Sequence, residues 1–379
     1  MNHTILKTTL IAALAANTYA GNTAAPAKSV KKEESIYDKL WSYPVLYKNK
    51  DADLLNELRF TGRAQFDVFS LDSGLGAEQD WLVRRLRGGI KAKMFKKLTL
   101  HVEGDFSPQD PTPFYSRLTD AYLAWEFDKA LVLKVGKQSA SFTLDGATSS
   151  KELITMDRSN LANNLWFTTE YVSGVSISGT KNNWEYELGF FSGGTDTPEF
   201  GNFDEGHFLI ASLGYDFADM IGAKKALLRG DYVYNDRNAE SNATRSFEHI
   251  GSINFQLDQG TWGVSTDMSY GSGYGSQGDV FGFLVMPFYN ITDKLQIVAR
   301  YTYLEGDTDN SLRFSRYESF ATSGRGDEYQ EIYAGLNYYL YGHKLKLQTG
   351  FTYAMMEDAA NDGGNYDGWS WTTGLRISW

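Results

Sequence analysis

The sequence predicts an all-β protein: a transmembrane antiparallel β-barrel of about 16 strands, with the third long loop folded inward. Three observations predict it. Apolar and polar residues alternate with a period of two along segments of roughly ten residues, the connections alternate between short and long, and the last segment ends on an aromatic residue. The composition agrees, because 24 Tyr and 37 Gly but only 7 Pro among 379 residues are typical of strands and tight turns.

Composition also excludes several classes of protein. The chain has no Cys, which excludes disulfides, thiolate metal sites and a cysteine nucleophile. The formal net charge of −11 argues against nucleic acid as a partner. No apolar run after the first 20 residues reaches the roughly 18 residues that a transmembrane helix needs.

Residues 1–20 have the pattern of a secretory signal peptide. Lys7 precedes an apolar run over 8–16, and Thr18-Tyr19-Ala20 is a small-residue cleavage site. The following residues, 21–57, begin with small and polar side chains and are interrupted at Pro44. We expect an exported chain with a periplasmic N-terminal segment at 21–57 and a transmembrane barrel at 58–379.

From Leu58 onward the hydrophobic pattern has a period of two. Leu58 and Phe60 alternate with Arg59 and Thr61, so one face of the strand is apolar and the other polar. Arg84 is an exception: it falls on an apolar face, near a loop end where a charge can reach water. Strands are expected near 58–70, 81–94, 97–107, 115–127, 130–138, 171–180, 183–192, 205–218, 223–236, 246–258, 261–272, 279–290, 293–305, 327–340, 343–355 and 367–379.

The connections between these strands alternate in length. Tight turns are expected at 95–97, 128–130, 181–182, 258–260, 291–293 and 341–342. Longer polar loops are expected at 71–80, 107–114, 139–170, 193–204, 237–245, 305–326 and 356–366. Short turns at one end and long loops at the other are typical of an outer-membrane barrel, in which apolar side chains meet lipid.

The final strand carries a specific signal. Trp369, Trp371, Ile377 and Trp379 fall on one face, and Arg376 falls on the other. An amphipathic last strand that ends on an aromatic residue resembles the signal read by the barrel-assembly machinery. We therefore expect that machinery and outer-membrane lipid as partners.

The insert at 139–170 is the most informative loop. Loops of about 30 residues are usually functional or disordered, but this one contains Phe142, Leu144, Leu161, Trp166 and Phe167. That much apolar surface needs a place to pack. We expect the insert to fold back into the hollow of the barrel.

Three stretches carry a family resemblance: RRLRGGIKAKMFKKLTLHVEGDFSPQDPTPFYSRLTDAYLAWEF from Arg84, LKVGKQSASFTLDGATSSKELITMDRSNLANNLWF, and YVSGVSISG. Their ordered series, strongest over 81–192, resembles the family of phosphate-selective porins O and P. The resemblance implies a homotrimer of sixteen-stranded barrels, with the third long loop as the constriction and with lumen arginines that form a ladder for anions.

The resemblance also implies particular site residues. Arg84 and Arg85 match the arginine pair of the second strand, and Ser149 and Ser150 match the serine pair of the loop. Arg158 matches the arginine that follows an acidic residue. Phosphate-selective members have a Lys before the Ala-Thr-Ser-Ser sequence, where this chain has Gly146, and that departure weakens the expectation of phosphate selectivity.

The strand alternation itself assigns charged residues to the lumen. The basic ones are Arg59, Arg63, Arg85, Arg87, Lys91, Lys93, Lys134, Arg229, Arg300, Lys344, Lys346 and Arg376. The acidic ones are Asp67, Glu103, Asp105, Asp120, Glu126, Glu185, Glu187, Asp231 and Glu248. Because Arg stays charged and its planar fork matches oxyanions, the early basic cluster favours anion passage.

The predicted function is therefore an outer-membrane porin for passive diffusion of small anions, phosphate-like or other oxyanions. Its predicted pore-lining and anion-binding residues are Arg59, Arg63, Arg84, Arg85, Arg87, Lys91, Ser149, Ser150 and Arg158. The alternative is a general or other-solute porin, for example for carbohydrates or organic acids, in which these charges form a salt-bridged lumen without phosphate selectivity. A third class is a binding or adhesion role for the long loops.

An enzyme is not expected. No HExxH, GxSxG or phosphate-cradling Gly loop occurs. His101, Glu103 and Asp105 share one strand face and are interpreted as lumen lining, and the acidic residues of 305–326 match no EF-hand spacing. The sequence thus predicts no catalytic residue, no cofactor and no metal site.

Overall fold

The computed structural model describes residues 35–109, 113–167, 170–195 and 199–379. The predicted signal peptide, residues 21–34 of the predicted N-terminal segment, and residues 168–169 of the insert lie outside the described residues.

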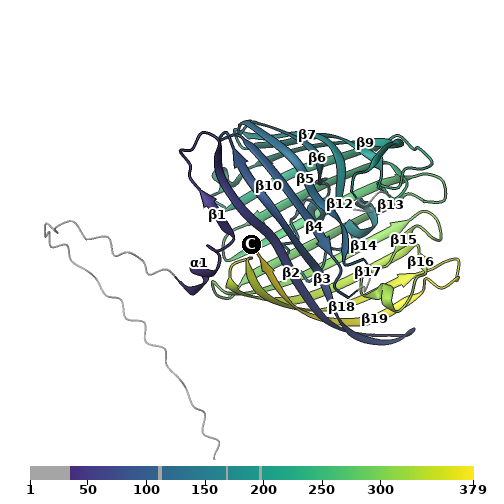
Figure 1. Cartoon of the computed structure of the whole chain (residues 1–379). Coiled ribbons are helices and arrows are strands. Elements are labelled where there is room, and N and C mark those ends of the chain that lie inside the picture. The colour runs from purple at the N-terminus through teal and green to yellow at the C-terminus, as the bar shows by residue number, and fades with distance from the viewer. Residues whose placement is uncertain (1–34, 110–112, 168–169, 196–198) are drawn as a thin grey trace, which may run out of the picture.

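A closed antiparallel barrel forms the body of the molecule (Figure 1). Within the described residues, each strand pairs with its neighbours in the chain, and the last strand closes the ring on the first, from Gly368↔Ser73 to Ser378↔Arg63. The prediction of an all-β antiparallel barrel of about 16 strands is confirmed. The barrel strands are β2 (Leu55–Ser73), β3 (Gly76–Met94), β4 (Leu98–Phe106), β5 (Tyr115–Asp128), β6 (Leu131–Ser139), β7 (Tyr171–Lys181), β8 (Trp184–Gly194), β9 (Asn202–Asp216), β10 (Lys225–Asn235), β11 (Phe247–Asp258), β12 (Trp262–Gly273), β13 (Val280–Asn290), β14 (Leu295–Gly306), β17 (Glu328–Tyr341), β18 (Leu345–Glu357) and β19 (Tyr366–Ser378).

The two faces of the barrel wall are inverted relative to a water-soluble protein. Outward-facing Phe351 is 57% exposed, whereas its near neighbour Lys346, which faces inward, is fully buried. The same contrast holds on β2, where Phe60 is exposed and Asp67 is buried. Closure satisfies the backbone groups, so the outer side chains can be apolar and meet hydrocarbon.

The two ends of the barrel differ in the length of their connections. One end, the short-turn end, has tight turns such as 95–97 and 342–344, with α4 (Ala218–Ile221) as its longest connection. The other, the long-loop end, has 107–114, 140–170, 236–246, 307–327 and 358–365. The predicted alternation of short and long connections is found, with one exception.

The exception is the predicted loop 71–80, which was wrong. β2 and β3 continue as a hairpin to the pair Ser73↔Gly76, so only two residues connect them at the long-loop end. In this extension Phe69 and Leu71 are almost fully buried, and Phe69 packs against Tyr317. The turn-forming residues in this stretch led to the prediction of a loop. The structure has a strand instead, and its inward face is apolar because a loop covers it.

The prediction that Arg84 falls on the apolar face of its strand is wrong, because the strand has a β-bulge at this residue. The register of β2 and β3 runs from Gln65↔Arg85 to Phe66↔Val83, so Arg84 is the extra residue of the bulge. A bulge resets the side-chain alternation. Arg84 and Arg85 therefore both make polar contacts inside the barrel, and Arg84 is not a charge on the outer face.

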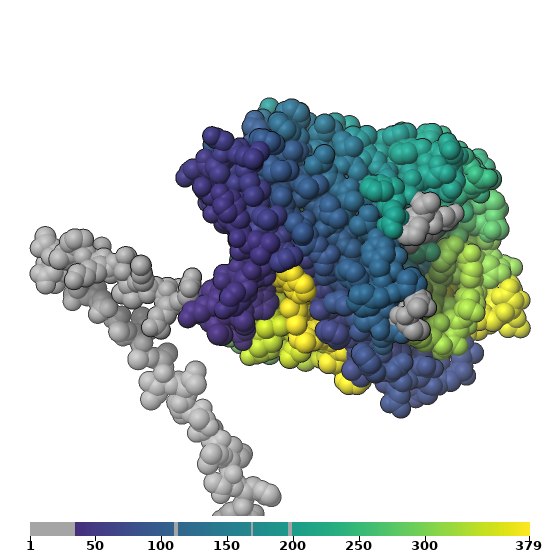
Figure 2. All heavy atoms as spheres, in the orientation of Figure 1, coloured from purple at the N-terminus to yellow at the C-terminus, as the bar shows by residue number. Residues whose placement is uncertain are grey.

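The residues before β2 attach to the short-turn end. They contain α1 (Ile36–Leu40), which has a capping box at Ser35, and β1 (Val45–Lys48), which pairs with β2. Trp41 Nε1 donates a hydrogen bond to the carbonyl of Ser378 at 2.6 Å. Figure 2 shows these purple residues beside the yellow C-terminal strand, so both ends of the described chain meet at this mouth.

Candidate functional site

The segment between β6 and β7 is folded rather than extended. It contains α2 (Leu144–Ala147) and α3 (Asn160–Leu165), and Thr143 and Ser159 cap their N-termini. Leu161 and Leu165 on α3 are fully buried, and the helix contacts β12, β13 and β14. The apolar residues that marked this insert in the sequence provide its packing.

Hydrogen bonds join the same segment to strands far from β6 and β7 in the ring. The Leu144 amide donates to Asp267 on β12 at 2.6 Å, and the Met156 amide donates to Tyr333 on β17 at 3.2 Å. Lys346 on β18 donates to the Leu153 carbonyl at 2.5 Å. These partners are inward-facing, so buried polar groups of the segment and of the wall satisfy one another.

One carboxylate, Glu170, holds three arginines near the end of the segment. It lies 3.7 Å from Arg85 and 3.4 Å from Arg87, and it forms a short ion pair with Arg158. Burial disfavours the charged form, but the guanidinium groups of Arg158, Arg85 and Arg87 outweigh it and hold the pKa of Glu170 well below its usual range. Glu170 is therefore an anion that fixes the arginines in place.

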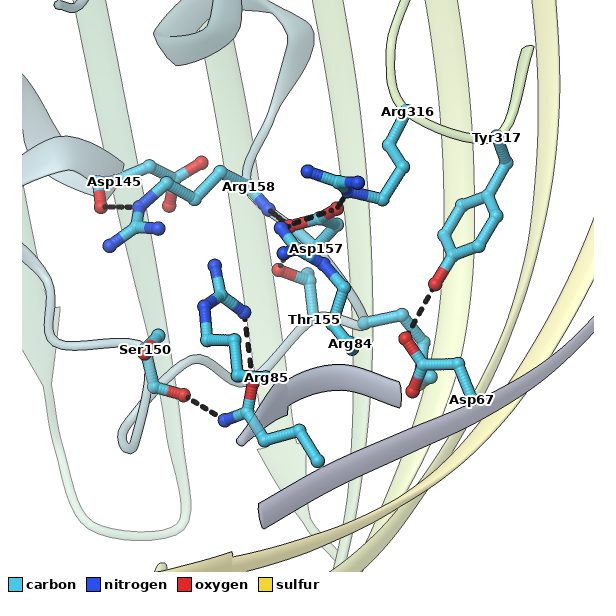
Figure 3. A network of polar contacts seen from close by, with 12 residues as sticks. Asp67, Arg84, Arg85, Asp145, Ser150, Thr155, Asp157, Arg158, Arg316 and Tyr317 are labelled. Atoms are coloured by element: carbon cyan, nitrogen blue, oxygen red, sulfur yellow. Dashed lines mark hydrogen bonds and ion pairs between the residues drawn. The ribbon is translucent and has the colours of Figure 1, made fainter. Parts of the chain in front are cut away.

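A second carboxylate, Asp157, does the same for two further arginines. Arg84 Nη2 donates to it at 3.0 Å, and Arg316 Nε lies 3.2 Å away (Figure 3). Burial opposes the charge, and the Arg84 and Arg316 guanidiniums reverse that effect, so the pKa of Asp157 is lowered. Arg84 comes from the barrel wall and Arg316 from the loop between β14 and β17, and Asp157 joins the two.

A third group of contacts connects the wall to the serine pair of the segment. Arg63 donates to Ser150 Oγ at 2.5 Å and to Glu103 at 3.2 Å. Gln65 donates to the Ser150 carbonyl at 2.9 Å and accepts from Arg85 at 2.8 Å. The segment is thus tied to β2, and the bond from Arg63 is charge-assisted and therefore stronger than a neutral one.

The groups around Glu170 and Asp157 line a cavity of about 380 Å³. Among the described residues, eight arginines line it: Arg84, Arg85, Arg87, Arg117, Arg158, Arg245, Arg300 and Arg316. Five carboxylates line it: Asp105, Asp157, Glu170, Glu318 and Glu331. The described residues of the cavity wall therefore carry an excess of three positive formal charges, in a chain whose net charge is −11.

One of these carboxylates adds less negative charge than its formal value. Glu318 in the short helix η1 (Glu318–Phe320) is 2% exposed, and burial together with the nearby charge of Glu331 raises its pKa to about 7. Near neutral pH it is partly protonated, so the positive excess in the cavity is larger than the formal count.

The structure brings six of the nine predicted site residues together: Arg63, Arg84, Arg85, Arg87, Ser150 and Arg158. The other three lie elsewhere. Arg59 and Lys91 face each other across β2 and β3 toward the short-turn end, and Ser149 is exposed next to Ser150.

Sequence reasoning missed the residues that hold the arginines. Glu170 and Asp157 are in the insert, and Arg316 and Glu318 are in a separate loop. The acidic residue directly before Arg158 was a signal for Asp157. No sequence pattern linked 316–318 to the insert, because only the closed barrel brings the two loops together.

Gly146 lies in a confined place. A Cβ at this position would be 3.0 Å from the Thr143 hydroxyl and 3.0 Å from the Trp166 ring. The Arg158 guanidinium stacks on that ring at 4.6 Å. A larger side chain here would require Thr143 or Trp166 to move by a few tenths of an ångström, and Trp166 carries Arg158.

The charged groups of this site are guanidiniums and carboxylates held in ion pairs. Across the described ranges, no group of three or more His, Asp or Glu side chains is placed to hold a metal ion. No helix of the described chain is long and apolar enough to cross a membrane. What the site offers is a set of fixed guanidinium groups beside water-accessible space.

Comparisons with known proteins agree with the barrel. The model of the family "Phosphate-selective porin O and P" matches residues 58–274, more than half of the chain. A search of curated proteins found no match.

Several solved structures share the fold at low identity. An anion-selective porin from Comamonas acidovorans superposes with a TM-score of 0.59 and 10% identity, covering 85% of this chain and 99% of that one. The outer membrane channel DcaP of Acinetobacter baumannii gives 0.57 and 13%, covering 88% and 99%. OprB of Pseudomonas putida gives 0.59 and 9%, covering 85% and 94%.

The closed barrel, the inward charged groups and the family match all indicate the same class of protein. The protein is an outer-membrane porin, a channel by family and by fold, and the chain belongs to the phosphate-selective porin O and P family.

Proposed function

We propose that this porin conducts small anions, and that segment 140–170 with the arginines of β2 and β3 forms its selective constriction. The observation that carries the proposal is the excess of arginines over carboxylates on the 380 Å³ cavity. Guanidinium groups attract oxyanions and stay charged at every physiological pH. Selectivity from such groups requires a site strong enough to be entered and weak enough to be left.

The ion pairs favour this balance. Arg85, Arg87 and Arg158 share Glu170, and Arg87 also pairs with Asp105 at 3.3 Å, so guanidinium groups outnumber carboxylates in this group and keep N–H groups for a passing anion. A site without Glu170 would bind anions too tightly for rapid passage. The carboxylates thus weaken the binding of anions without removing it.

A second candidate is a general porin for uncharged or mixed solutes. The observation that favours it is that Glu170 and Asp157 partly neutralise the arginines. The pore would then have an electric field across it, from a basic side to an acidic side, and not a continuous ring of positive charge. The replacement of the family lysine by Gly146 points the same way for phosphate. In this reading, phosphate does not block chloride current at low concentration, and a tight block would contradict it.

The test is the reversal potential in planar bilayers under a KCl gradient. The double variant Arg85→Glu with Arg87→Glu should shift it toward cations, and Arg85→Gln with Arg87→Gln should shift it by less in the same direction. Lys96→Glu with Lys97→Glu, in the turn after β3, is the control with the same change in net charge. An unchanged potential in the first two variants would remove these arginines from the selectivity filter.

We also propose a homotrimer. One solved structure with this fold, OmpT of Vibrio cholerae, is described as a trimer form; it has a TM-score of 0.53 and 14% identity, covering 85% of this chain and 99% of that one. Conductance that increases in groups of three equal steps on insertion would support the assignment. Single equal steps would contradict it.

A further inference from the structure

The loop at 307–327, between β14 and β17, places a carboxyl group against the barrel wall. It contains three short elements: β15 (Leu312–Arg313), η1 (Glu318–Phe320) and β16 (Arg325–Gly326). Glu318 is 2% exposed, and Tyr329 and Glu331 on β17 are buried as well. We call Glu318, Tyr329 and Glu331 the carboxyl bridge.

The phenol of the bridge has two carboxyl groups beside it. Tyr329 Oη lies 2.9 Å from Glu318 Oε1 and 3.3 Å from Glu331 Oε2. A phenol has a single proton to donate. If both carboxyl groups were ionised, one of them would face the phenol oxygen with no proton between the two atoms. A second proton, on one of the carboxyl groups, satisfies both contacts.

The neighbouring charges decide which carboxyl group carries that proton. Glu331 accepts from Arg300 Nε at 2.8 Å, so its negative charge has a counter-ion. Among the residues that the structure describes, no Lys, Arg or His nitrogen lies within 4.0 Å of the Glu318 carboxyl group, whose other oxygen accepts from the Ser315 amide at 3.0 Å. The proton therefore belongs on Glu318.

The other charged and titratable groups around η1 are engaged elsewhere. Arg316 Nε lies 3.2 Å from Asp157 in segment 140–170. The phenol of Tyr317 donates to Asp67 on β2 at 2.6 Å. Tyr366 at the start of β19 is also close and buried, and a tyrosine is neutral near pH 7. None of these groups supplies the bridge with a positive charge.

The bridge fixes a loop that forms part of the cavity wall. From this loop, Phe314, Arg316 and Tyr317 line the 380 Å³ cavity. Loss of the proton would put two negative charges beside one phenol, in surroundings that disfavour charge. Burial and the charge of Glu331 raise the pKa of Glu318 to about 7, so this loss occurs near neutral pH.

We propose that the carboxyl bridge is a proton-binding site that holds the loop at 307–327 docked on the cavity. Protonated Glu318 donates to Tyr329, and Tyr329 donates to Glu331. When Glu318 ionises, its proton passes to water, one contact of the phenol loses its hydrogen bond, and η1 is released from β17. The cavity then widens. The proposal does not depend on which solutes pass through the channel.

The sign of the pH dependence follows from the two states of the loop. In the released loop Glu318 has the ordinary pKa of a glutamate, about 4.3, and in the docked loop it has a pKa of about 7. The contribution of the proton to docking is therefore complete below about pH 4.3 and is lost as the pH rises through about 7.

The proton itself is tested by infrared difference spectroscopy on the full-length protein in detergent. A protonated carboxyl group has a carbonyl band that an ionised one lacks. The wild type should therefore show one such band more than Glu318→Gln at about pH 5, and the difference should be absent at about pH 8. Glu240→Gln, which changes an exposed loop carboxylate, should match the wild type. Equal bands in the wild type and Glu318→Gln at both pH values would overturn the proposal.

Single-channel records in planar bilayers test the docking. In the wild type, the ratio of time in a wider, noisier state to time in the docked state should rise by up to about tenfold per pH unit and level off above about pH 7. The amide of Glu318→Gln can donate to Tyr329 and accept from Ser315 at every pH, so this variant should stay docked. Glu240→Gln should follow the wild type.

Tyr329→Phe should have the opposite effect. It removes the phenol that joins the two carboxyl groups, so the wider state should dominate even at about pH 5. A wild-type pH response that persists in Glu318→Gln, or a Tyr329→Phe channel that stays docked in acid, would overturn the proposal. The wild-type reversal potential, measured alongside, decides the proposed function separately, because a cation preference with the same pH response would leave the carboxyl bridge in place.

Discussion

At the scale of the residue, the site consists of arginines whose positions are fixed by a few acids. Glu170 contacts Arg85, Arg87 and Arg158, and Asp157 contacts Arg84 and Arg316. In the proposed function, the arginines provide the field and the carboxylates determine how much of that field a solute meets.

Glu170→Gln should therefore make the channel more selective for anions. The amide can still accept from the arginines, but it no longer neutralises them, so the reversal potential should move further toward that of chloride. Loss of one partner from a buried pair costs about 3–5 kcal/mol, so a lower unfolding temperature is also expected. Glu126→Gln, which removes a more exposed carboxylate paired with Lys93, is the control and should change neither. A shift toward cations in Glu170→Gln would show that this carboxylate does not oppose anion entry.

Lys151, which follows Ser150 in segment 140–170 and lies 3.4 Å from the Trp379 carbonyl, provides a pH dependence. Burial and the charge of Arg63 lower its pKa to about 8. The ammonium is charged below that pH and becomes neutral as the pH rises through it, so anion preference should fall between pH 7 and pH 9. Lys151→Arg keeps the charge and should flatten the curve at the high level, and Lys151→Met should flatten it at the low level. Equal slopes in all three proteins would assign the titration to another group.

At the scale of the element, segment 140–170 depends on α3. Leu161 and Leu165 are fully buried, and a Cβ at Gly282 or Gly271 on the wall would come within 2.6 or 2.7 Å of them. The fit is close because the wall presents glycine where the leucines lie. The packing of this helix and the hydrogen bonds to Tyr333 and Lys346 act together.

Leu161→Ala with Leu165→Ala should loosen the segment without opening the barrel. Each truncation removes about 2–5 kcal/mol of packing, so larger conductance steps and more open-channel noise are expected in single-channel records. Leu188→Ala, on an outward-facing side chain that is 54% exposed, is the control for the same chemical change. Unchanged conductance and noise would mean that α3 does not limit the passage.

The elements also show what a sequence can predict. The period of two predicted the strands correctly, because successive side chains of a barrel strand face lipid and water in turn. It failed at Arg84, since a bulge resets the alternation, and at Phe69 and Leu71, since a loop covers that inward face. The arginines of β2 and β3 were predictable from their strands. Their partner Glu170 was not, and neither was Arg316, which shares Asp157 with Arg84, because contacts between loops depend on how the ring closes.

At the scale of the whole molecule, apolar side chains face outward and charges face inward around a closed ring. Phe351 near the middle of β18 should lie in hydrocarbon. Phe351→Arg should then cost about 2–4 kcal/mol of folding free energy in lipid vesicles, as for a charge near the bilayer midplane. Thr352→Arg, on the next residue and lining the cavity, should cost clearly less. Equal costs for the two variants, measured by denaturant unfolding, would contradict the assignment of the faces.

The most direct test is the reversal potential of the wild-type protein in a planar bilayer between dilute and concentrated KCl. An excess of arginines along the passage predicts a value near the equilibrium potential of chloride. A value near that of potassium would contradict it, since the acidic groups would then dominate the path of the solute.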